Sequence, residues 1–462
     1  MEPSLGIRNV SDWKVEAKNE TSIDYFVRFP LVDRLVDGSR CFVVGRRGTG
    51  KTAIASYIDS KYRSSIVNFD SFPFQTLFKF KDEDLSSNSE YISVWKNLIY
   101  HQTLKYLFQK KELPSDVAAN LDSVFGDYSK LSTFDSVDKW KKFSFGVNIL
   151  GVDVKSSAER ESTDKVIDIR RANENIERLL SDTAFSPVFI LIDEIDEDFS
   201  SKLQYREAFN RLMAGLLKAV QEVKTKLRNK IIPIVFLRED IYWELKDTSK
   251  SKWIDFIIKP EWKIETIKQI VTHRLSLAYE YEFKDFQEAW KTFCAPENIV
   301  FGSKRTLHSF SYVGQFTQGR PREYIQFMKI LAEAAYQSGA SQIVGDDFKR
   351  EIFKFSQQMT TEYESEIEFK FAHAERVLTA IREMRRMDIR YGDFRRELGL
   401  QKAARDEKEA IDICHFLYKI GVFGHKYHSE KTVFISDRLG SEFDMKAPIF
   451  VHRSVHSYLG LA

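Results

Sequence analysis

The segment Gly45–Thr52 (GRRGTGKT) has the spacing GxxxxGK[ST], in which each residue type has a chemical reason. Glycines let the backbone curl so that successive N–H groups point at phosphate oxygens, and a helix start behind the loop adds its positive dipole end. Lys51 is placed to reach the β- and γ-phosphates, and the Thr52 hydroxyl is placed to ligate Mg²⁺. The predicted nucleotide-binding residues are Gly45, Arg46, Arg47, Gly48, Thr49, Gly50, Lys51 and Thr52.

Two carboxylates follow the apolar run PVFILI at residues 187–192. Asp193 ends a buried strand, where it can hold magnesium through water. Glu194 is placed to orient or deprotonate an attacking water. The alternative is an exposed acidic turn, but a phosphate-binding loop earlier in the chain favours a hydrolytic site. Because no NKxD motif for reading guanine appears, we expect ATP rather than GTP.

Two arginines are further candidates for the site. Arg238 ends the apolar run IIPIVFL and is placed either to contact phosphate or to pair with Glu239 or Asp240. Arg322 follows Pro321, which fits the first position of a helix, and it could fold over a bound nucleotide. The alternative for Arg322 is an ordinary basic surface residue.

The elements that must position these residues alternate between short apolar runs and helical patterns. A run apolar on both faces is typical of a central parallel strand covered by helices on both sides, so the chain predicts a doubly wound α/β domain. The expected strands are Ser39–Val44, Pro187–Ile192 and Ile231–Leu237, with Ser65–Phe69 as a further candidate. Pro233 is unfavourable inside the strand Ile231–Leu237, because proline has no N–H to donate to a neighbouring strand.

Residues 71–184 contain no second phosphate-binding feature and predict a helical insertion in this domain. Its helices are expected at Tyr91–Lys110 and Lys165–Leu180, with a hairpin at Phe143–Val154. The ATPase core with its insertion would then cover residues 1–262.

The remaining chain predicts two more units. Residues 263–360 form a helical lid, with helices at Ile264–Leu277, Phe283–Phe293, Pro321–Gln337 and Gly345–Phe355. A polar joint near Thr360–Glu366 leads to residues 361–462, which predict a winged helix. Its helices are expected at Phe371–Met387, Asp393–Leu398 and Asp406–Ile420, and its strands at Val422–Tyr427 and Lys431–Ile435.

Bulk composition narrows the class of protein. A net charge of +2 over 462 residues gives no global signal for nucleic acid. The three cysteines fit no metal or CxxC spacing. Because the chain shows neither a signal peptide nor an apolar run long enough to span a bilayer, we expect a cytoplasmic protein without membrane association.

The motifs GRRGTGKT, FILIDE, IVFLRED and GRPRE, followed by a winged helix, resemble those of the AAA+ and STAND groups of P-loop ATPases. The nearest shapes are origin-recognition initiator ATPases and a bacterial family of P-loop ATPases, some linked to anti-phage defence. The resemblance implies ATP with Mg²⁺, a homo-oligomer, and nucleotide-dependent assembly or switching. Two departures are Arg238, where Asn, Ser or Thr is usual, and the lack of an arginine finger.

The winged helix leaves two partners open, DNA or an effector or other partner protein. Its expected recognition helix carries an acidic first half, which disfavours phosphates, whereas the wing offers Lys426 and Lys431 around Tyr427. A basic stretch precedes it, at Arg382, Arg385, Arg386, Arg390, Arg395 and Arg396. The leading interpretation is an ATP-hydrolysing switch, and the alternative is a non-hydrolytic, nucleotide-dependent regulator that binds DNA or protein.

Overall fold

The computed structural model divides into two compact units. One holds residues 28–47 and 51–260, and the other holds residues up to Val27, residues 48–50 and the chain from Glu261 onward. The described residues are 4–67, 69, 77–78, 89–131, 163–195, 206–301, 305–371, 373–400, 404–426, 432–435 and 442–461. The predicted hairpin at 143–154 lies outside them, as do Tyr427 and Lys431 of the predicted wing.

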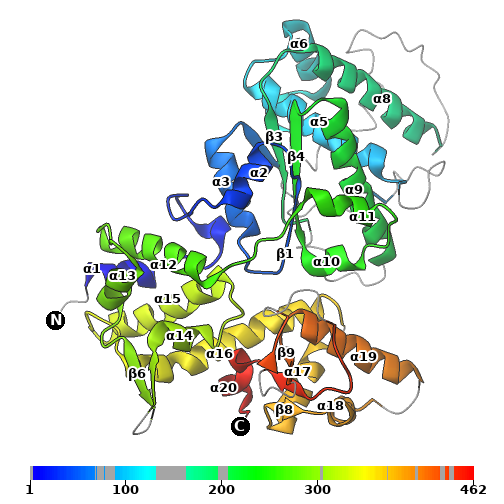
Figure 1. Ribbon diagram of the computed structural model, residues 1–462. Coiled ribbons are helices and arrows are strands. Elements are labelled where there is room, and N and C mark those ends of the chain that lie inside the picture. Colours follow the sequence, from blue (N-terminus) through cyan, green and yellow to red (C-terminus); the bar gives the residue numbers. More distant parts are fainter. Residues whose placement is uncertain are drawn as a thin grey trace. The chain divides into compact units, whose positions relative to one another are not determined.

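A five-stranded parallel sheet organises the unit of residues 28–47 and 51–260 (Figure 1). Its strand order is β2-β3-β4-β1-β5, and every neighbouring pair is parallel. The strands are β1 Phe42–Gly45, β2 Ser64–Val67, β3 Val188–Ile192, β4 Ile231–Arg238 and β5 Ile257–Ile258. The predicted α/β class with a doubly wound parallel sheet is therefore confirmed.

Helices cover both faces of this sheet. Helices α2 (Pro30–Val36) and α3 (Lys51–Lys61) lie on one side, and α5 (Ile92–Gln109) and α9 (Arg206–Lys226) lie on the other (Figure 1). All five residues of β3 are buried, as expected for a strand covered on both faces. Pro233 does lie inside β4, opposite Ile190 of β3, although proline has no N–H to donate to the ladder.

The insertion is helical in its described part, as predicted. Helices α5, α6 (Ser115–Phe125) and α8 (Thr163–Asp182) belong to it. The Trp95 indole Nε1 donates to the Leu212 carbonyl at 2.8 Å, which ties α5 to α9. The Asn97 amide donates to Asn173 at 2.9 Å and ties α5 to α8. The first bond holds the insertion against α9 of the sheet domain, and the second joins two helices within the insertion; breaking either would leave a buried polar group unpaired, which is costly. The short helices α10 (Glu239–Glu244) and α11 (Lys250–Trp253) follow β4.

The other unit is mainly helical and includes the N-terminal segment. Helix α1 (Leu5–Ser11) packs against α12 and α15, so residues up to Val27 group with the helices after Glu261 rather than with the predicted core. Arg274 of α12 lies over the rings of Trp13 and Tyr25, at 5.1 and 4.7 Å. The helices are α12 Ile264–Tyr279, α13 Phe286–Phe293, α14 Ser309–Gly314, α15 Pro321–Gln337 and α16 Gly345–Glu368, with a hairpin of β6 Asn298–Phe301 and β7 Arg305–His308.

Helix α16 runs through Thr360–Glu366, where the sequence predicts a joint. One hydrophobic core continues from the helices around it into the C-terminal residues. In their described part, these residues form four α-helices and a four-stranded antiparallel sheet of order β10-β9-β11-β8. The elements are α17 Ala374–Met384, β8 Asp388–Ile389, α18 Tyr391–Glu397, α19 Ala404–Lys419, β9 Phe423–Lys426, β10 Thr432–Val433, β11 Ile449–Val451 and α20 His456–Leu459.

No helix in the part of the chain that the structure describes combines the length and apolarity needed to cross a bilayer.

Candidate functional site

The phosphate-binding loop has the predicted strand–turn–helix context. Strand β1 ends at Gly45 and α3 begins at Lys51. Gly48 and Gly50 have φ of 77° and 83°, a left-handed conformation that glycine adopts without a Cβ penalty. The Lys51 ammonium donates to the Gly45 carbonyl at 3.1 Å and to the Arg46 carbonyl at 3.2 Å. The lysine therefore already lies over the loop that would hold the phosphates.

The turn of the loop contacts other residues of its own unit. A Cβ added at Gly48 would lie 3.2 Å from Cδ and 3.3 Å from Cβ of Arg322. The Trp262 indole Nε1 donates to the Thr49 carbonyl at 3.2 Å. Arg322, a sequence-predicted site residue, thus has its aliphatic stem against the turn of the loop.

The predicted carboxylates follow β3 directly. Asp193 is 7% exposed. Glu194 has φ of 56°, which is uncommon for a residue that is not glycine and costs free energy. Non-glycine residues held in this conformation cluster at functional sites. The left-handed backbone at Glu194 lies between two buried residues, Asp193 and Ile195. This conformation determines the direction in which the Glu194 side chain leaves the backbone.

The sheet brings these segments to one edge. In the parallel ladders, Gly45 of β1 lies opposite Arg238 of β4, and Ile192 of β3 lies opposite Val235. The loop after β1, the carboxylates after β3 and the end of β4 therefore share the carboxyl edge, which is where open α/β sheets bind ligands.

Arg238 forms an ion pair rather than standing free. Its Nε and Nη2 donate to the two Asp240 carboxylate oxygens at 3.0 and 2.7 Å, and these side chains are only 12% and 14% exposed. Burial favours a neutral Asp240, but the charges of Arg238 and Lys51 outweigh it and hold the pKa of Asp240 below its ordinary value. Glu239 pairs instead with Lys259 at 3.1 Å.

Of the two alternatives for Arg238, the structure thus contains the ion pair with Asp240. Asp240 lies within electrostatic reach of Lys51, whereas the sequence predicts it only as a pairing partner of Arg238. The sequence feature that could have marked Asp240 as a site residue is its position two residues beyond the apolar run that forms β4.

The two arginines that open α15 differ in how they are held. Arg320 is 4% exposed, and its Nε donates to Glu323 at 2.8 Å. Burial would lower the pKa of Arg320, but the charges of Glu323 and Glu366 raise it above its ordinary value. Arg322 lies 2.5 Å from Glu16 and 3.3 Å from Glu362, and its side chain is 15% exposed. Arg320 is therefore buried and bonded to carboxylates within the protein. Arg322 is held by one carboxylate from the N-terminal segment and one from α16.

The donor set suits magnesium bound together with a nucleotide. The Thr52 hydroxyl and Asp193 carboxylate are hard oxygen donors of the kind Mg²⁺ prefers. Among the described residues, no three His, Cys, Asp or Glu side chains form a metal-binding group. Magnesium in a phosphate site needs only one or two protein oxygens, because phosphates and waters supply the rest.

The basic stretch near α17 and α18 is only partly available for a partner. Arg395 pairs with Glu407 and Arg396 with Asp393, each at 2.6 Å, and Arg382 lies over the Tyr458 ring. Arg385, Arg386 and Arg390 are exposed and, within the described ranges, form neither an ion pair nor a ring contact. Lys426 at the end of β9 is also exposed.

Comparison with known proteins finds one family and several individual proteins. Residues 265–364 match the model of the FunZ-associated C-terminal helical domain. The putative transposon gamma-delta 80.3 kDa protein of Escherichia coli K12 is 22% identical over 338 residues, which cover 67% of this chain. This match covers only 44% of the length of that protein.

Two solved structures are similar over nearly the whole chain, at low superposition scores. Cdc6p from Pyrobaculum aerophilum is 12% identical with a TM-score of 0.34, covering 97% of this chain and 96% of its own. The ORC2 protein from Aeropyrum pernix, solved as ADPNP-ADP complexes, is 13% identical with a TM-score of 0.31, covering 98% of each chain.

Proposed function

We propose that this chain binds ATP with Mg²⁺ through Gly45–Thr52 and hydrolyses it as a molecular switch. The observation that carries the proposal is the carboxyl edge of the sheet, where the loop after β1 and the pair Asp193 and Glu194 after β3 flank β4. A non-hydrolytic regulator would need the loop but would have no use for Glu194 in its costly backbone conformation. ATP turnover by the purified chain, and its loss when the Glu194 carboxylate is removed, tests the proposal.

Each residue has a distinct role in this proposal. The Lys51 ammonium exchanges the loop carbonyls for the β- and γ-phosphate oxygens. The Thr52 hydroxyl and Asp193 would hold Mg²⁺, which would stabilise the charge that develops on the phosphates. Glu194 orients the attacking water and accepts its proton. Arg46 and Arg47 lie in the loop as predicted nucleotide-binding residues, and nothing in the structure gives them individual roles.

Arg322 is proposed to couple the bound nucleotide to the helical segment that carries it. Its stem lies against Gly48, and a phosphate would compete with Glu16 and Glu362 for its guanidinium. Arg238 would act beside the site through Asp240 and its field at Lys51, and not by direct contact with phosphate in the conformation seen here. Release of Arg322 from Glu16 would free the N-terminal segment, which offers a route from ATP binding to assembly of a homo-oligomer.

Replacing Arg322 with alanine is expected to weaken ATP binding by about tenfold or more, since hydrogen bonds to charged groups contribute about 1.5–3 kcal/mol. Titration of a fluorescent ATP analogue measures the change. Arg350→Ala on α16, where the arginine is 63% exposed, is the control and should bind like the wild type. ATP affinity within twofold of the wild type in Arg322→Ala would remove Arg322 from the site.

The C-terminal elements support duplex DNA as a second part of the proposal. Their order, α17-β8-α18-α19-β9-β10-β11, with a small antiparallel sheet, agrees with the winged helix expected from the sequence. Arg385, Arg386 and Arg390 offer three uncommitted positive charges beside it. The name of the Escherichia coli relative refers to a transposon, which agrees with a DNA partner. Against DNA stands the acidic first turn of α19 with Asp406 and Glu407.

Changing these three arginines to alanine together is expected to weaken duplex DNA binding and to reduce its salt dependence. Each lost phosphate contact lowers the slope of log K against log salt by about 0.9, so the slope should fall by about 2 to 3. Fluorescence anisotropy across a salt series measures it, with Arg396→Ala as the control because Arg396 pairs with Asp393. An unchanged slope of log K against log salt would favour a partner protein over DNA. In a separate assay, stimulation of ATP turnover by a phage component would support a role in anti-phage defence.

A further inference from the structure

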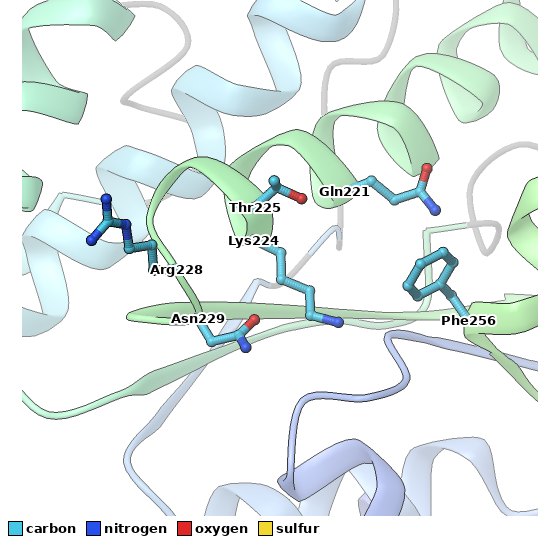
Figure 2. A pocket seen from close by; sticks show the side chains of 6 residues that line it. All are labelled: Gln221, Lys224, Thr225, Arg228, Asn229 and Phe256. Carbon is cyan, nitrogen blue, oxygen red and sulfur yellow. The ribbon is translucent and has the colours of Figure 1, made fainter.

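A pocket of about 260 Å³ lies at the amino edge of the parallel sheet (Figure 2). Arg228 and Asn229 precede β4, and Phe256 precedes β5. Strands β4 and β5 both neighbour β1 and run parallel to it, so the pocket is at the edge opposite to Gly45. At about 3.3 Å per residue, the eight residues of β4 separate the two edges by roughly 25 Å. The pocket is therefore separate from the proposed ATP site.

Helix α9 and two loops build the walls. Gln221, Lys224 and Thr225 come from the last turns of α9. Figure 2 shows Lys224 extending between Asn229 and Phe256, while Arg228 extends in the opposite direction, away from Lys224. The Lys224 ammonium lies 5.3 Å from the centre of the Phe256 ring. One wall is thus aromatic, and the rest present nitrogen and oxygen atoms.

The backbone that presents Arg228 and Asn229 is unusual. Both residues are left-handed, with φ of 48° and 60°. Asparagine tolerates this conformation, but arginine pays a free-energy cost for it. The turn is held by backbone bonds from Arg228 N to the Thr225 carbonyl at 3.2 Å and from Asn229 N to the Lys224 carbonyl at 3.0 Å. The same bonds satisfy the terminal carbonyls of α9, which would otherwise present negative charge to the pocket.

Ion pairs and side-chain hydrogen bonds do not engage the polar side chains that line the pocket, among the described residues. Across the described ranges, Lys224 and Arg228 form no ion pair, and the side chains of Gln221, Thr225 and Asn229 form no hydrogen bond. Lys226, also in the last turn of α9, instead pairs with Glu177 at 3.3 Å. Asp37 is the carboxylate whose charge Lys224 reaches, and Asp37 already accepts a hydrogen bond from the Ser39 N–H at 2.7 Å. The lining therefore holds two positive charges and no carboxylate of its own.

We propose that this pocket binds a small organic phosphate, with the phosphate on the Lys224 ammonium and the organic part against Phe256. Lys224 supplies the charge that meets the phosphate, and Arg228 adds a second positive charge to the lining of the pocket. The amides of Gln221 and Asn229 and the Thr225 hydroxyl can bond the remaining oxygens. The volume is slightly below the range of about 300–1,000 Å³ for sites of drug-sized ligands, so it suits a ligand no larger than one nucleotide.

Calorimetric titration of Lys51→Ala protein with AMP, ribose 5-phosphate and inorganic phosphate tests the proposal without relying on the ATP site. We expect AMP and ribose 5-phosphate to bind this variant and the wild type equally, and inorganic phosphate to bind more weakly because it lacks the part that packs on Phe256. Lys224→Met should weaken binding by about tenfold or more, and Arg228→Met should weaken it less, because Arg228 acts only through its charge. AMP binding tighter than that of ribose 5-phosphate would identify a nucleotide as the ligand, whereas equal binding would identify any sugar phosphate.

Lys226→Met is the matched control on the same helix and should bind like the wild type. Thermal melting of each variant separates lost binding from lost folding. Binding that disappears in Lys51→Ala, binding that is equal in Lys224→Met and Lys226→Met, or no heat from any of the three ligands at millimolar concentration would each overturn the proposal. None of these outcomes depends on whether the chain hydrolyses ATP.

Discussion

Replacing Glu194 with glutamine is expected to reduce ATP hydrolysis by about 10²- to 10⁴-fold, the usual contribution of a positioned general base. The amide keeps the size of the side chain and the backbone bend but cannot accept the proton of the attacking water. ATP affinity should stay within about threefold, because Lys51, Thr52 and Asp193 are unchanged. Phosphate release under saturating ATP and titration of a fluorescent ATP analogue measure the two quantities separately.

The control for this variant is Glu174→Gln, which changes an exposed carboxylate on α8 and should leave both quantities alone. If Glu194→Gln consumed ATP at the wild-type rate, the assignment of Glu194 would be wrong. If it lost ATP binding together with hydrolysis, Glu194 would instead be a structural residue of the site.

Replacing Arg238 with alanine is expected to lower the free energy of unfolding of the sheet domain by about 3–5 kcal/mol, the cost of breaking a mostly buried ion pair. The change leaves the Asp240 carboxylate buried without its bidentate partner. Urea unfolding followed by tryptophan fluorescence measures it. The double variant with Asp240→Ala should recover part of the loss, because the unpaired charge is then removed as well. Arg28→Ala, which breaks an exposed pair with Asp33, should cost at most about 1 kcal/mol.

The effect of Arg238→Ala should also depend on pH. The pKa of Asp240 is lowered in the folded protein, so its contribution is present above the unfolded pKa of about 3.9 and is lost as pH falls through the folded value. The difference between wild type and Arg238→Ala should therefore be full at pH 7 and shrink below about pH 4. A difference under 1 kcal/mol at pH 7 would contradict the role of this ion pair.

The sheet, and the placement of the glycine-rich loop and the two carboxylates at one of its edges, could be predicted because their signals are local. A buried strand, a glycine-rich turn and a helix start lie in one continuous stretch at Phe42–Lys61, and β3 runs directly into Asp193. The long helices α5, α8, α12 and α15 were predicted to within a few residues, because their apolar spacing extends over several turns.

The features that the sequence did not predict are either very short or depend on residues far apart in the chain. Strands β5 and β8 are two residues long, too short to show any alternation. The contact of Glu16 with Arg322 joins the N-terminal segment to α15, and no local pattern marks it. Helix α16 continues through Thr360–Glu366 because one face of that polar segment, at Thr360, Tyr363, Glu366 and Ile367, is buried against neighbouring elements, which sequence polarity alone does not reveal.

The central claim is that Gly45–Thr52 with Asp193 and Glu194 makes an ATP-hydrolysing site. Phosphate release from ATP with Mg²⁺, measured side by side for the wild-type chain and Lys51→Ala, tests it most directly. We expect steady turnover by the wild type, none when magnesium is chelated, and none by Lys51→Ala. Equal release by the two proteins, or no release by the wild type even with duplex DNA present, would contradict it.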